Sequence, residues 1–400
     1  MTRYQSSSGL AFLTDFWKKY YLQEYIAQGG SKIKFITGRE GSGKTYALRQ
    51  IRRDAEEEGY LTVSFSLKKL LLKDFQMFYL EILNHVDVTD LLRRCGNQAV
   101  RNRGNDPEKI PEGRTAMEYF SGGGWDPLLY RSYHDELATM FLSNANMDRS
   151  FATVCAMITA EYLGMNRPDM NARDLMLRWM HCDKEVKAKQ LKPLGFMAQP
   201  ITKINARHML RSLAEVVRFA GYKGLCVLID DVDALARPKG NEFVRYKKNQ
   251  RDDIYEIIRQ LIDDIDTMKY MFFVFAFERS LIDNEQTGFK SYQALWMRIQ
   301  TEVSGKRFNR FADLLDLDLL ADTIYPAEAL VEMSGKLADV LEEQGYAGAQ
   351  PVAEEASGAE AAVKRLTAEE AAALLEKSQF GGLGLPYLVN RATLGTGKEE

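Results

Sequence analysis

The amino-acid sequence predicts an α/β fold in which helices cover a parallel sheet. The first observation is a glycine-rich loop, residues 38–45, which follows a short apolar run at Lys34–Thr37 and precedes a helical pattern at Tyr46–Glu58. The second observation is a pair of near-continuous apolar runs, at 224–229 and 270–277. Such runs are typical of parallel strands that are buried on both faces. Strands that alternate with helices in this way predict a doubly wound sheet.

The loop itself has the residue types that a phosphate-binding site needs. It reads Gly38, Arg39, Glu40, Gly41, Ser42, Gly43, Lys44 and Thr45, a complete Walker A motif. Glycines let backbone N–H groups curl around an anion without a Cβ in the way, and the helix that follows adds its positive dipole end. We therefore expect the loop to bind ATP, with Lys44 reaching the β- and γ-phosphates and the Thr45 hydroxyl holding Mg²⁺.

The composition limits the classes of protein to consider. The chain has 400 residues, 46% of them apolar and 27% charged, as in an ordinary globular protein larger than one domain. The net charge of −3 argues against a strongly basic nucleic-acid coat. We see no apolar stretch long enough for a membrane span, and no signal peptide. The cysteines show no paired or zinc-binding spacing, which fits a reducing cytoplasm. They are Cys95, Cys155, Cys182 and Cys226.

The remaining elements follow along the chain. Aromatic residues at helical spacing in Gly9–Gln28 predict an N-terminal helix that packs on the core, and alternation in Leu61–Ser66 predicts the second strand. The distance from Lys44 to Asp230 is too long for a simple core, so we expect an insertion of roughly 100 residues, mostly helical. Within it, Gly96–Trp125 is rich in Gly, Asn, Arg and Pro and indicates a loop-like section.

We therefore predict a chain of six parts. These are an N-terminal helical segment at 1–29, the phosphate-loop part of the core at 30–85, a mainly helical insertion at 86–210, the second part of the core at 211–320, a helical lid at 321–392 with a flexible linker at 344–364, and a disordered tail at 393–400.

Two acids end the strand at 224–229. Val227-Leu228-Ile229-Asp230-Asp231 has the Walker B pattern, and we expect its strand to run beside the phosphate loop, with Asp230 near Mg²⁺ and Asp231 orienting the attacking water. The alternative is a strand that ends in solvated carboxylates. Paired acids favour an ATPase that moves or remodels something over a small-molecule kinase. We expect Asp233, two residues on, to face solvent or to cap the next segment.

Basic and polar residues after the fourth strand are further candidates. Arg298, at the end of a helical stretch that starts at Tyr292, lies where oligomeric ATPases carry an arginine finger that reaches a neighbour's γ-phosphate. The alternative is an intrachain ion pair. Arg307 and Arg310 are weaker candidates for the same role. Glu278 lies near the polar sensor position.

Two basic stretches suit contacts to nucleic-acid phosphates, since Tyr and Asn lie between or beside the charges. The alternative is that each is a solvated face. One contains Arg245, Lys247, Lys248 and Arg251, and the other contains Arg93, Arg94, Arg101, Arg103 and Arg114.

Taken together, several segments resemble the ATP-binding domain of BREX-type bacterial phage-defence systems, within the wider AAA+ group. The segments are Phe35–Thr45, Asp174–Met180, Gly221–Asp231, and Ser291–Leu295 leading to Arg298. The resemblance implies an AAA+-like P-loop NTPase with a helical lid, using ATP and Mg²⁺. It also implies an oligomeric or complex-bound ATPase that works with other defence proteins and engages DNA, with duplex DNA as a candidate ligand.

Two departures from the family pattern keep two functions open. Asp231 replaces the usual Glu, so its carboxylate falls about 1 Å short of the water, which can cost on the order of 10²-fold in rate. Tyr387 follows Gly384-Leu385-Pro386 where a sensor Arg often occurs, and Arg391, one helical turn later, is a candidate substitute. The leading hypothesis is an ATPase that cycles between oligomeric states. The alternative is a slowly hydrolysing, nucleotide-gated switch or scaffold that recruits a protein partner.

Overall fold

The chain folds around a five-stranded parallel sheet, so the predicted α/β class is confirmed. The computed structural model describes residues 9–40, 42–167, 169–196, 198–236, 246–303 and 309–324. The strands are β1 (Ser31–Gly38), β2 (Leu61–Ser66), β3 (Leu225–Asp230), β4 (Met271–Glu278) and β5 (Leu314–Asp316), in the spatial order β2-β3-β4-β1-β5. The last of these was not expected, because three residues are too few to show a period.

Alternating side chains of β4 explain its continuous apolar run. Phe273, Phe275 and Phe277 belong to one buried cluster, while Phe272 and Val274 belong to a second cluster on the opposite face. Successive side chains of a strand point to opposite faces, so both faces of this sheet must be covered. The register also aligns the carboxyl ends of neighbouring strands: Gly38 lies opposite Glu278, and Ser66 lies opposite Asp230.

One face of the sheet is covered by the N-terminal helices and by the helix that follows the phosphate loop. These are α1 (Gly9–Trp17), the π-helical segment η1 (Lys18–Tyr25) and α2 (Lys44–Glu57). The Trp17 ring packs edge-on against Phe272, with centroids 5.7 Å apart, and Tyr21 lies 6.2 Å from the same ring. Aromatic residues of the N-terminal segment therefore pack on the sheet beside α2.

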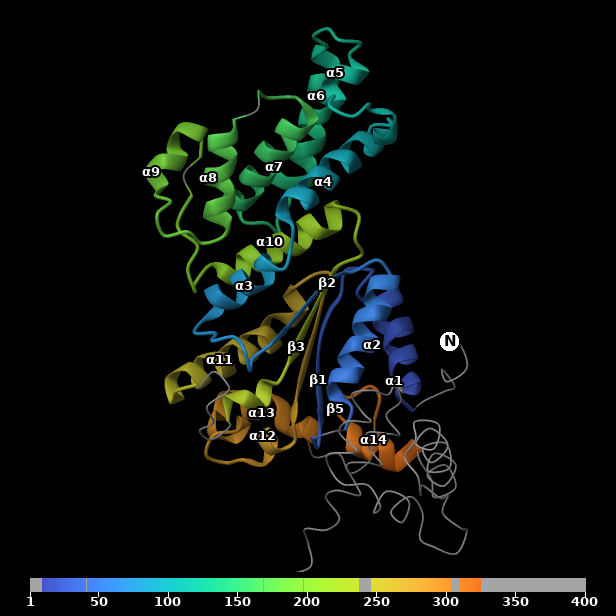
Figure 1. Ribbon diagram of the computed structural model, residues 1–400, viewed down its shortest axis with the longest axis vertical. Helices are drawn as coiled ribbons and strands as arrows, with labels where there is room; N and C mark the ends of the chain where they lie inside the picture. Colours follow the sequence, from blue (N-terminus) through green and yellow to red (C-terminus); the bar gives the residue numbers. More distant parts are fainter. Residues whose placement is uncertain are drawn as a thin grey trace, which may run out of the picture.

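The helices that connect β2 to β3 form a body beyond the amino ends of the strands (Figure 1). This helical body comprises α3 (Phe75–Asn84), α4 (Val88–Asn102), η2 (Pro107–Lys109), α5 (Ala116–Phe120), α6 (Pro127–Leu137), η3 (Ala138–Leu142), α7 (Arg149–Leu163), α8 (Met170–Met180), α9 (Ala188–Leu191), η4 (Lys192–Leu194) and α10 (Ala206–Phe219). One apolar cluster runs from the sheet through α3 and α10 into this body.

The stretch Gly96–Trp125 is less loop-like than expected. It contains the second half of α4 and all of α5. The buried residues Cys95, Ala99 and Val100 continue the apolar face of α4 at helical spacing, which outweighs the Gly and Asn content of the stretch.

The second half of the core adds helices around the carboxyl ends of the strands and on the face of the sheet that carries Phe273, Phe275 and Phe277. They are η5 (Val232–Leu235), α11 (Lys248–Asp264), η6 (Ile265–Thr267), α12 (Ser280–Asp283), η7 (Phe289–Ser291), α13 (Gln293–Val303) and α14 (Leu317–Ile324). Within the described residues, no helix is both long and apolar enough to cross a membrane. The predicted lid after Ile324, its linker and the tail, with Tyr387 and Arg391, lie outside the described residues.

Candidate nucleotide-binding site

The phosphate loop has the predicted strand–loop–helix context, between the end of β1 and the start of α2. Gly43 is the N-cap of α2 and has φ 92°, a left-handed conformation that strongly favours glycine. Gly38 is required for a different reason, since a Cβ there would lie 2.4 Å from Ser42 Oγ. Gly41 lies outside the described residues. The backbone of the loop is thus tightly folded at both ends.

Lys44 folds back over the loop. Its ammonium donates hydrogen bonds to the carbonyl oxygens of Gly38 and Arg39, at 3.1 and 2.7 Å. Burial lowers the pKa of Lys44, and the negative charge of nearby Glu278 opposes that effect. Among the described residues, the hydrogen-bond partners of this partly buried ammonium are neutral carbonyls, and a phosphate oxygen that enters the loop is a stronger partner.

Thr45 and Asp230 bring together the two oxygen ligands predicted for Mg²⁺. The Thr45 hydroxyl donates to Asp230 Oδ2 at 2.7 Å. Burial raises the pKa of Asp230, the negative charge of Asp231 raises it further, and the bond from Thr45 lowers it. Mg²⁺ prefers such hard oxygen ligands and in nucleotide sites is held by one or two side chains plus phosphates. The described residues contain no cluster of three or more His, Cys, Asp or Glu that would cage a metal alone.

The position of β3 in the sheet differs from the expectation. β3 was expected to run beside the phosphate loop, but β4 lies between β3 and β1. Asp230 still reaches the loop because α2 starts there and carries Thr45 across the end of β4.

The second acid, Asp231, is held by residues from β2 and the turn after it. The Ser66 hydroxyl donates to Asp231 Oδ2 at 2.6 Å, and Lys68 Nζ lies 2.5 Å from Oδ1. The backbone of Asp231 is left-handed, with φ 58°, and its amide donates to Asp230 Oδ1 at 2.8 Å. Since β2 flanks β3 on the side away from β4 and β1, the Asp231 carboxylate is held on the side away from the phosphate loop. No sequence signal pointed to Ser66 or Lys68.

Asp233 does not face solvent, contrary to expectation. Its side chain is 3% exposed, and Oδ1 accepts a hydrogen bond from the backbone N–H of Glu278 at 3.1 Å. Asp231, which precedes η5, has a left-handed backbone, and Asp233 in η5 contacts the end of β4 rather than the solvent. Glu278 itself ends β4 opposite Gly38, and its negative charge opposes the lowering of the Lys44 pKa that burial causes.

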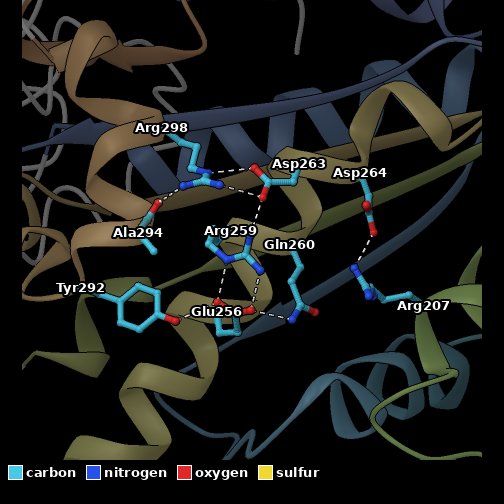
Figure 2. Close-up of polar contacts among 9 residues, drawn as sticks. All are labelled: Arg207, Glu256, Arg259, Gln260, Asp263, Asp264, Tyr292, Ala294 and Arg298. Carbon is cyan, nitrogen blue, oxygen red and sulfur yellow. Dashed lines mark hydrogen bonds and ion pairs between the residues drawn. The ribbon is translucent and has the colours of Figure 1, made fainter.

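Arg298 is engaged within its own chain, as the alternative interpretation had it (Figure 2). Its Nε and Nη2 donate to Asp263 Oδ1 and Oδ2 at 2.8 and 3.0 Å, and Nη1 donates to the Ala294 carbonyl at 2.7 Å. Arg259 also pairs with Asp263 and makes a two-pronged contact with Glu256. These contacts join α11 to α13 and do not bring Arg298 to the phosphate loop of the same chain.

The weaker finger candidates have other surroundings. The Arg310 guanidinium lies over the rings of Phe16 and Phe311, 4.5 and 5.4 Å from their centroids. Arg307 lies outside the described residues.

Most arginines of the basic stretch from Arg93 to Arg114 lie close to acidic side chains. Arg93 and Arg94 both pair with Asp90, Arg94 at 2.6 Å. In the same stretch, Arg103 lies 3.0 Å from Glu136, and Arg101 lies 3.9 Å from Glu108. Such pairing reduces the local positive charge available to a nucleic-acid phosphate.

In the other basic stretch, from Arg245 to Arg251, one candidate for phosphate contact is buried. Arg251 belongs to the buried face of α11 and is 8% exposed, so it is unsuited to a surface contact. Arg245 lies outside the described residues, while Lys247 and Lys248 are exposed at the start of α11.

Comparison with known proteins gives one match. A family model described as BREX system ATP-binding protein BrxC/D matches residues 22–93 and 129–378. These two segments make up most of the chain and contain the phosphate loop, Asp230, Asp231 and Arg298. No curated protein and no solved structure matches the chain.

Proposed function

This chain belongs to the family of BREX system ATP-binding proteins BrxC/D, and we propose that it binds Mg²⁺–ATP in the loop at residues 38–45 and hydrolyses it. The observation that carries the proposal is the hydrogen bond from Thr45 to Asp230, at 2.7 Å, beside a loop in which the Lys44 ammonium donates to the carbonyls of Gly38 and Arg39. An ammonium and a hydroxyl from the start of α2 and a carboxylate from the end of β3 converge there, as Mg²⁺–triphosphate binding requires.

Each residue has a distinct task in this proposal. The loop amides and Lys44 bind and orient the phosphates, and Thr45 with Asp230 holds the cation. Bound Mg²⁺ supplies charge neutralisation at the phosphate oxygens. Asp231 orients the attacking water, which requires its carboxylate to leave Ser66 and Lys68. Hydrolysis is therefore slow while those two contacts persist.

We further propose that the chain is an AAA+-like component of a bacterial anti-phage assembly. In this role, its nucleotide state controls self-association and the engagement of DNA or of another defence protein. Family membership supports the setting in a multi-protein system. Arg298 would act on the nucleotide of a neighbouring chain, after exchanging Asp263 for a γ-phosphate.

A second candidate function is a nucleotide-gated switch that binds ATP, hydrolyses it slowly and recruits a protein partner. The specific observation in its favour is the double contact of Asp231 with Ser66 and Lys68. An acid held in this way does not activate water, whereas ATP binding by the loop remains intact.

The deciding experiment measures ATP hydrolysis per chain over a range of protein concentrations, with and without duplex DNA, alongside ATP binding. Lys44→Ala is the control for the site. A per-chain rate that rises with concentration, and again with DNA, supports a shared-site ATPase that acts on nucleic acid. Tight ATP binding with a background rate throughout supports the switch. A wild-type protein that does not bind ATP contradicts both.

A further inference from the structure

Polar contacts join the ends of three adjacent strands at the start of the phosphate loop. The backbone N–H of Arg39 donates to Asp318 Oδ2 at 2.9 Å, and Arg39 Nε lies 3.3 Å from the same oxygen. Asp318 is in the first turn of α14, and its own N–H donates to Asp316 Oδ1 at 2.9 Å, at the end of β5. The loop is thus tied to the chain that follows β5.

The contacts then return to the loop. Asp316 Oδ2 pairs with Arg279 Nη1, and the backbone N–H of Arg279 donates to the Gly38 carbonyl at 3.2 Å. The loop-anchoring ring, defined by Gly38, Arg39, Arg279, Asp316 and Asp318, therefore starts and ends on the peptide that connects Gly38 to Arg39. It links the carboxyl ends of β4, β1 and β5, which are neighbours in the sheet.

The charges of the ring are balanced. Asp316 is 5% exposed and the Asp318 side chain 14%, and two guanidinium groups face these two carboxylates. Burial raises the pKa of Asp316, and Arg279 opposes that rise. Removing one partner from such a set leaves a buried charge uncompensated. Balanced acids also do not repel the phosphates that we propose bind next to them.

The ring acts on the group that binds phosphate. The two carbonyls that accept from the Lys44 ammonium, at 3.1 and 2.7 Å, belong to Gly38 and Arg39, the two residues that the ring fixes. Ser42 also packs closely against the backbone at Gly38, which leaves this peptide little room to move. A shift of the peptide between Gly38 and Arg39 therefore displaces Lys44 and the turn that presents the loop amides.

We infer that Asp318 is a positioning residue of the phosphate loop, itself held by Asp316 and Arg279, and that it sets the affinity of the site for nucleoside di- and triphosphates. This inference rests on the proposed function. Asp318 acts through the loop, whose amides contact phosphates that ATP and ADP share. Its loss therefore weakens the binding of both nucleotides in parallel, whereas a group that senses only the γ-phosphate affects ATP alone.

The test is nucleotide affinity in Asp318→Ala, measured by calorimetric titration with Mg²⁺–ATP and with Mg²⁺–ADP. We expect both dissociation constants to rise about tenfold to a hundredfold, the loss typical of a charge-assisted hydrogen bond. Asp318→Asn keeps an oxygen acceptor for the Arg39 amide and is expected to recover most of the affinity. If Asp318 has a purely structural role, both variants should unfold at a lower temperature. The affinities for ATP and ADP should then not fall together in Asp318→Ala and return in Asp318→Asn.

Asp283→Ala is the matched control. Asp283 lies 3.8 Å from Arg279 Nε and is 63% exposed, but it is outside the ring, so its removal should leave both affinities unchanged. If Asp318→Ala does not fold, Asp318→Glu keeps the charge and displaces the acceptor, and the same parallel loss is expected. If Lys44→Ala abolishes binding while Asp318→Ala and Asp318→Glu bind as the wild type does, the inference is wrong and the proposed function stands. If the wild type itself does not bind ATP, the proposed function fails first.

Discussion

Lys68 is one of two side chains that hold the carboxylate of Asp231, the acid directly after β3. Its ammonium lies 2.5 Å from Asp231, and both side chains are about three-quarters buried or more. In Lys68→Met this ion pair is lost and the hydrogen bond from Ser66 remains. We expect the ATP hydrolysis rate to rise about threefold, the factor that corresponds to a partly exposed ion pair. The measurement is phosphate release at saturating ATP.

Lys69→Met is the control for that variant, because it removes the same charge from an exposed side chain one residue later, whereas the described contacts of the Asp231 carboxylate come from Ser66 and Lys68. Equal rates in Lys68→Met, Lys69→Met and the wild type would mean that the ion pair does not limit hydrolysis.

The length of Asp231 gives a separate prediction at the same scale. Asp231→Glu extends the carboxylate by one methylene, beyond its contact with Ser66 and closer to the expected position of the attacking water. If acid length limits the rate, turnover should rise by up to about 10²-fold, because misplacement by 1 Å costs that much. Asp231→Asn, which has no charge to orient water, should bind ATP and show only background phosphate release. A Glu variant no faster than the wild type would show that acid length is not the limit.

At the scale of elements, local signals were sufficient for β1, the phosphate loop and α2, because glycine positions and apolar spacing within one short stretch define all three. The apolar runs of β3 and β4 were recognised for the same reason. The order of the strands was not, since β3 was expected beside the phosphate loop and β4 lies between them. Strand order depends on contacts between distant parts of the chain, which no local period reports.

The same limit applies to the side chains of the site. Thr45 and Asp230 were predicted together because each belongs to a motif with known chemistry. Lys68 belongs to no motif, and Asp318 follows a strand of three residues. Asp233 was misjudged because its burial depends on the left-handed backbone of Asp231, a conformation that non-glycine residues rarely adopt.

Lys34 connects two elements and gives a prediction about pH. It is fully buried in β1, and its ammonium donates to the carbonyls of Phe311 and Ala312 and to Asp313 Oδ1, at 2.7 to 2.9 Å, just before β5. Burial lowers the pKa of Lys34 to about 8, although the charges of Asp313 and Glu302 oppose the shift. Between pH 8 and the ordinary value of 10.5, the unfolded chain binds more protons than the folded chain, so this group adds stability as pH rises.

We expect this pH effect to disappear in Lys34→Met. The difference in the free energy of unfolding between wild type and variant, measured in urea, should change in favour of the wild type by about 2 kcal/mol from pH 7 to pH 9.5. Lys32→Met, which removes the other lysine bonded to Asp313, controls for the loss of a charge at that carboxylate. A wild-type-to-Lys34→Met difference that is constant over this range would contradict the predicted shift.

At the scale of the whole molecule, the phosphate loop and the helical body lie at opposite ends of the sheet (Figure 1). One close-packed apolar cluster nevertheless joins that body to the face of the sheet that carries Phe273 and Phe275. Close packing of this kind resists deformation and transmits strain, so the cluster is a continuous packed connection between the sheet and the helical body. The turn that carries Lys68 is also the start of the connection into α3. The proposed control of a partner surface by the nucleotide state would use this connection.

The proposed action of Arg298 on the nucleotide of a neighbouring chain gives the last predictions. Its three donor contacts lie within its own chain, so a role in trans requires exchange of Asp263 for a neighbour's γ-phosphate. We expect Arg298→Ala to bind ATP as the wild type does and to lose turnover. Arg207→Ala removes a similar ion pair, to Asp264 at 2.6 Å, and should retain turnover (Figure 2).

The trans role makes a sharper prediction for mixed chains. Lys44→Ala chains lack a working phosphate loop but keep Arg298, and Arg298→Ala chains have the reverse defect. If the arginine acts between chains, mixing two inactive preparations creates interfaces with one intact site, and ATP hydrolysis should reappear and vary with the mixing ratio. If Arg298 acts only within its own chain, or only pairs with Asp263, no ratio restores activity, because no chain in the mixture holds both groups. Turnover retained by Arg298→Ala alone would also exclude the finger and would leave α11 and α13 joined by a purely structural network.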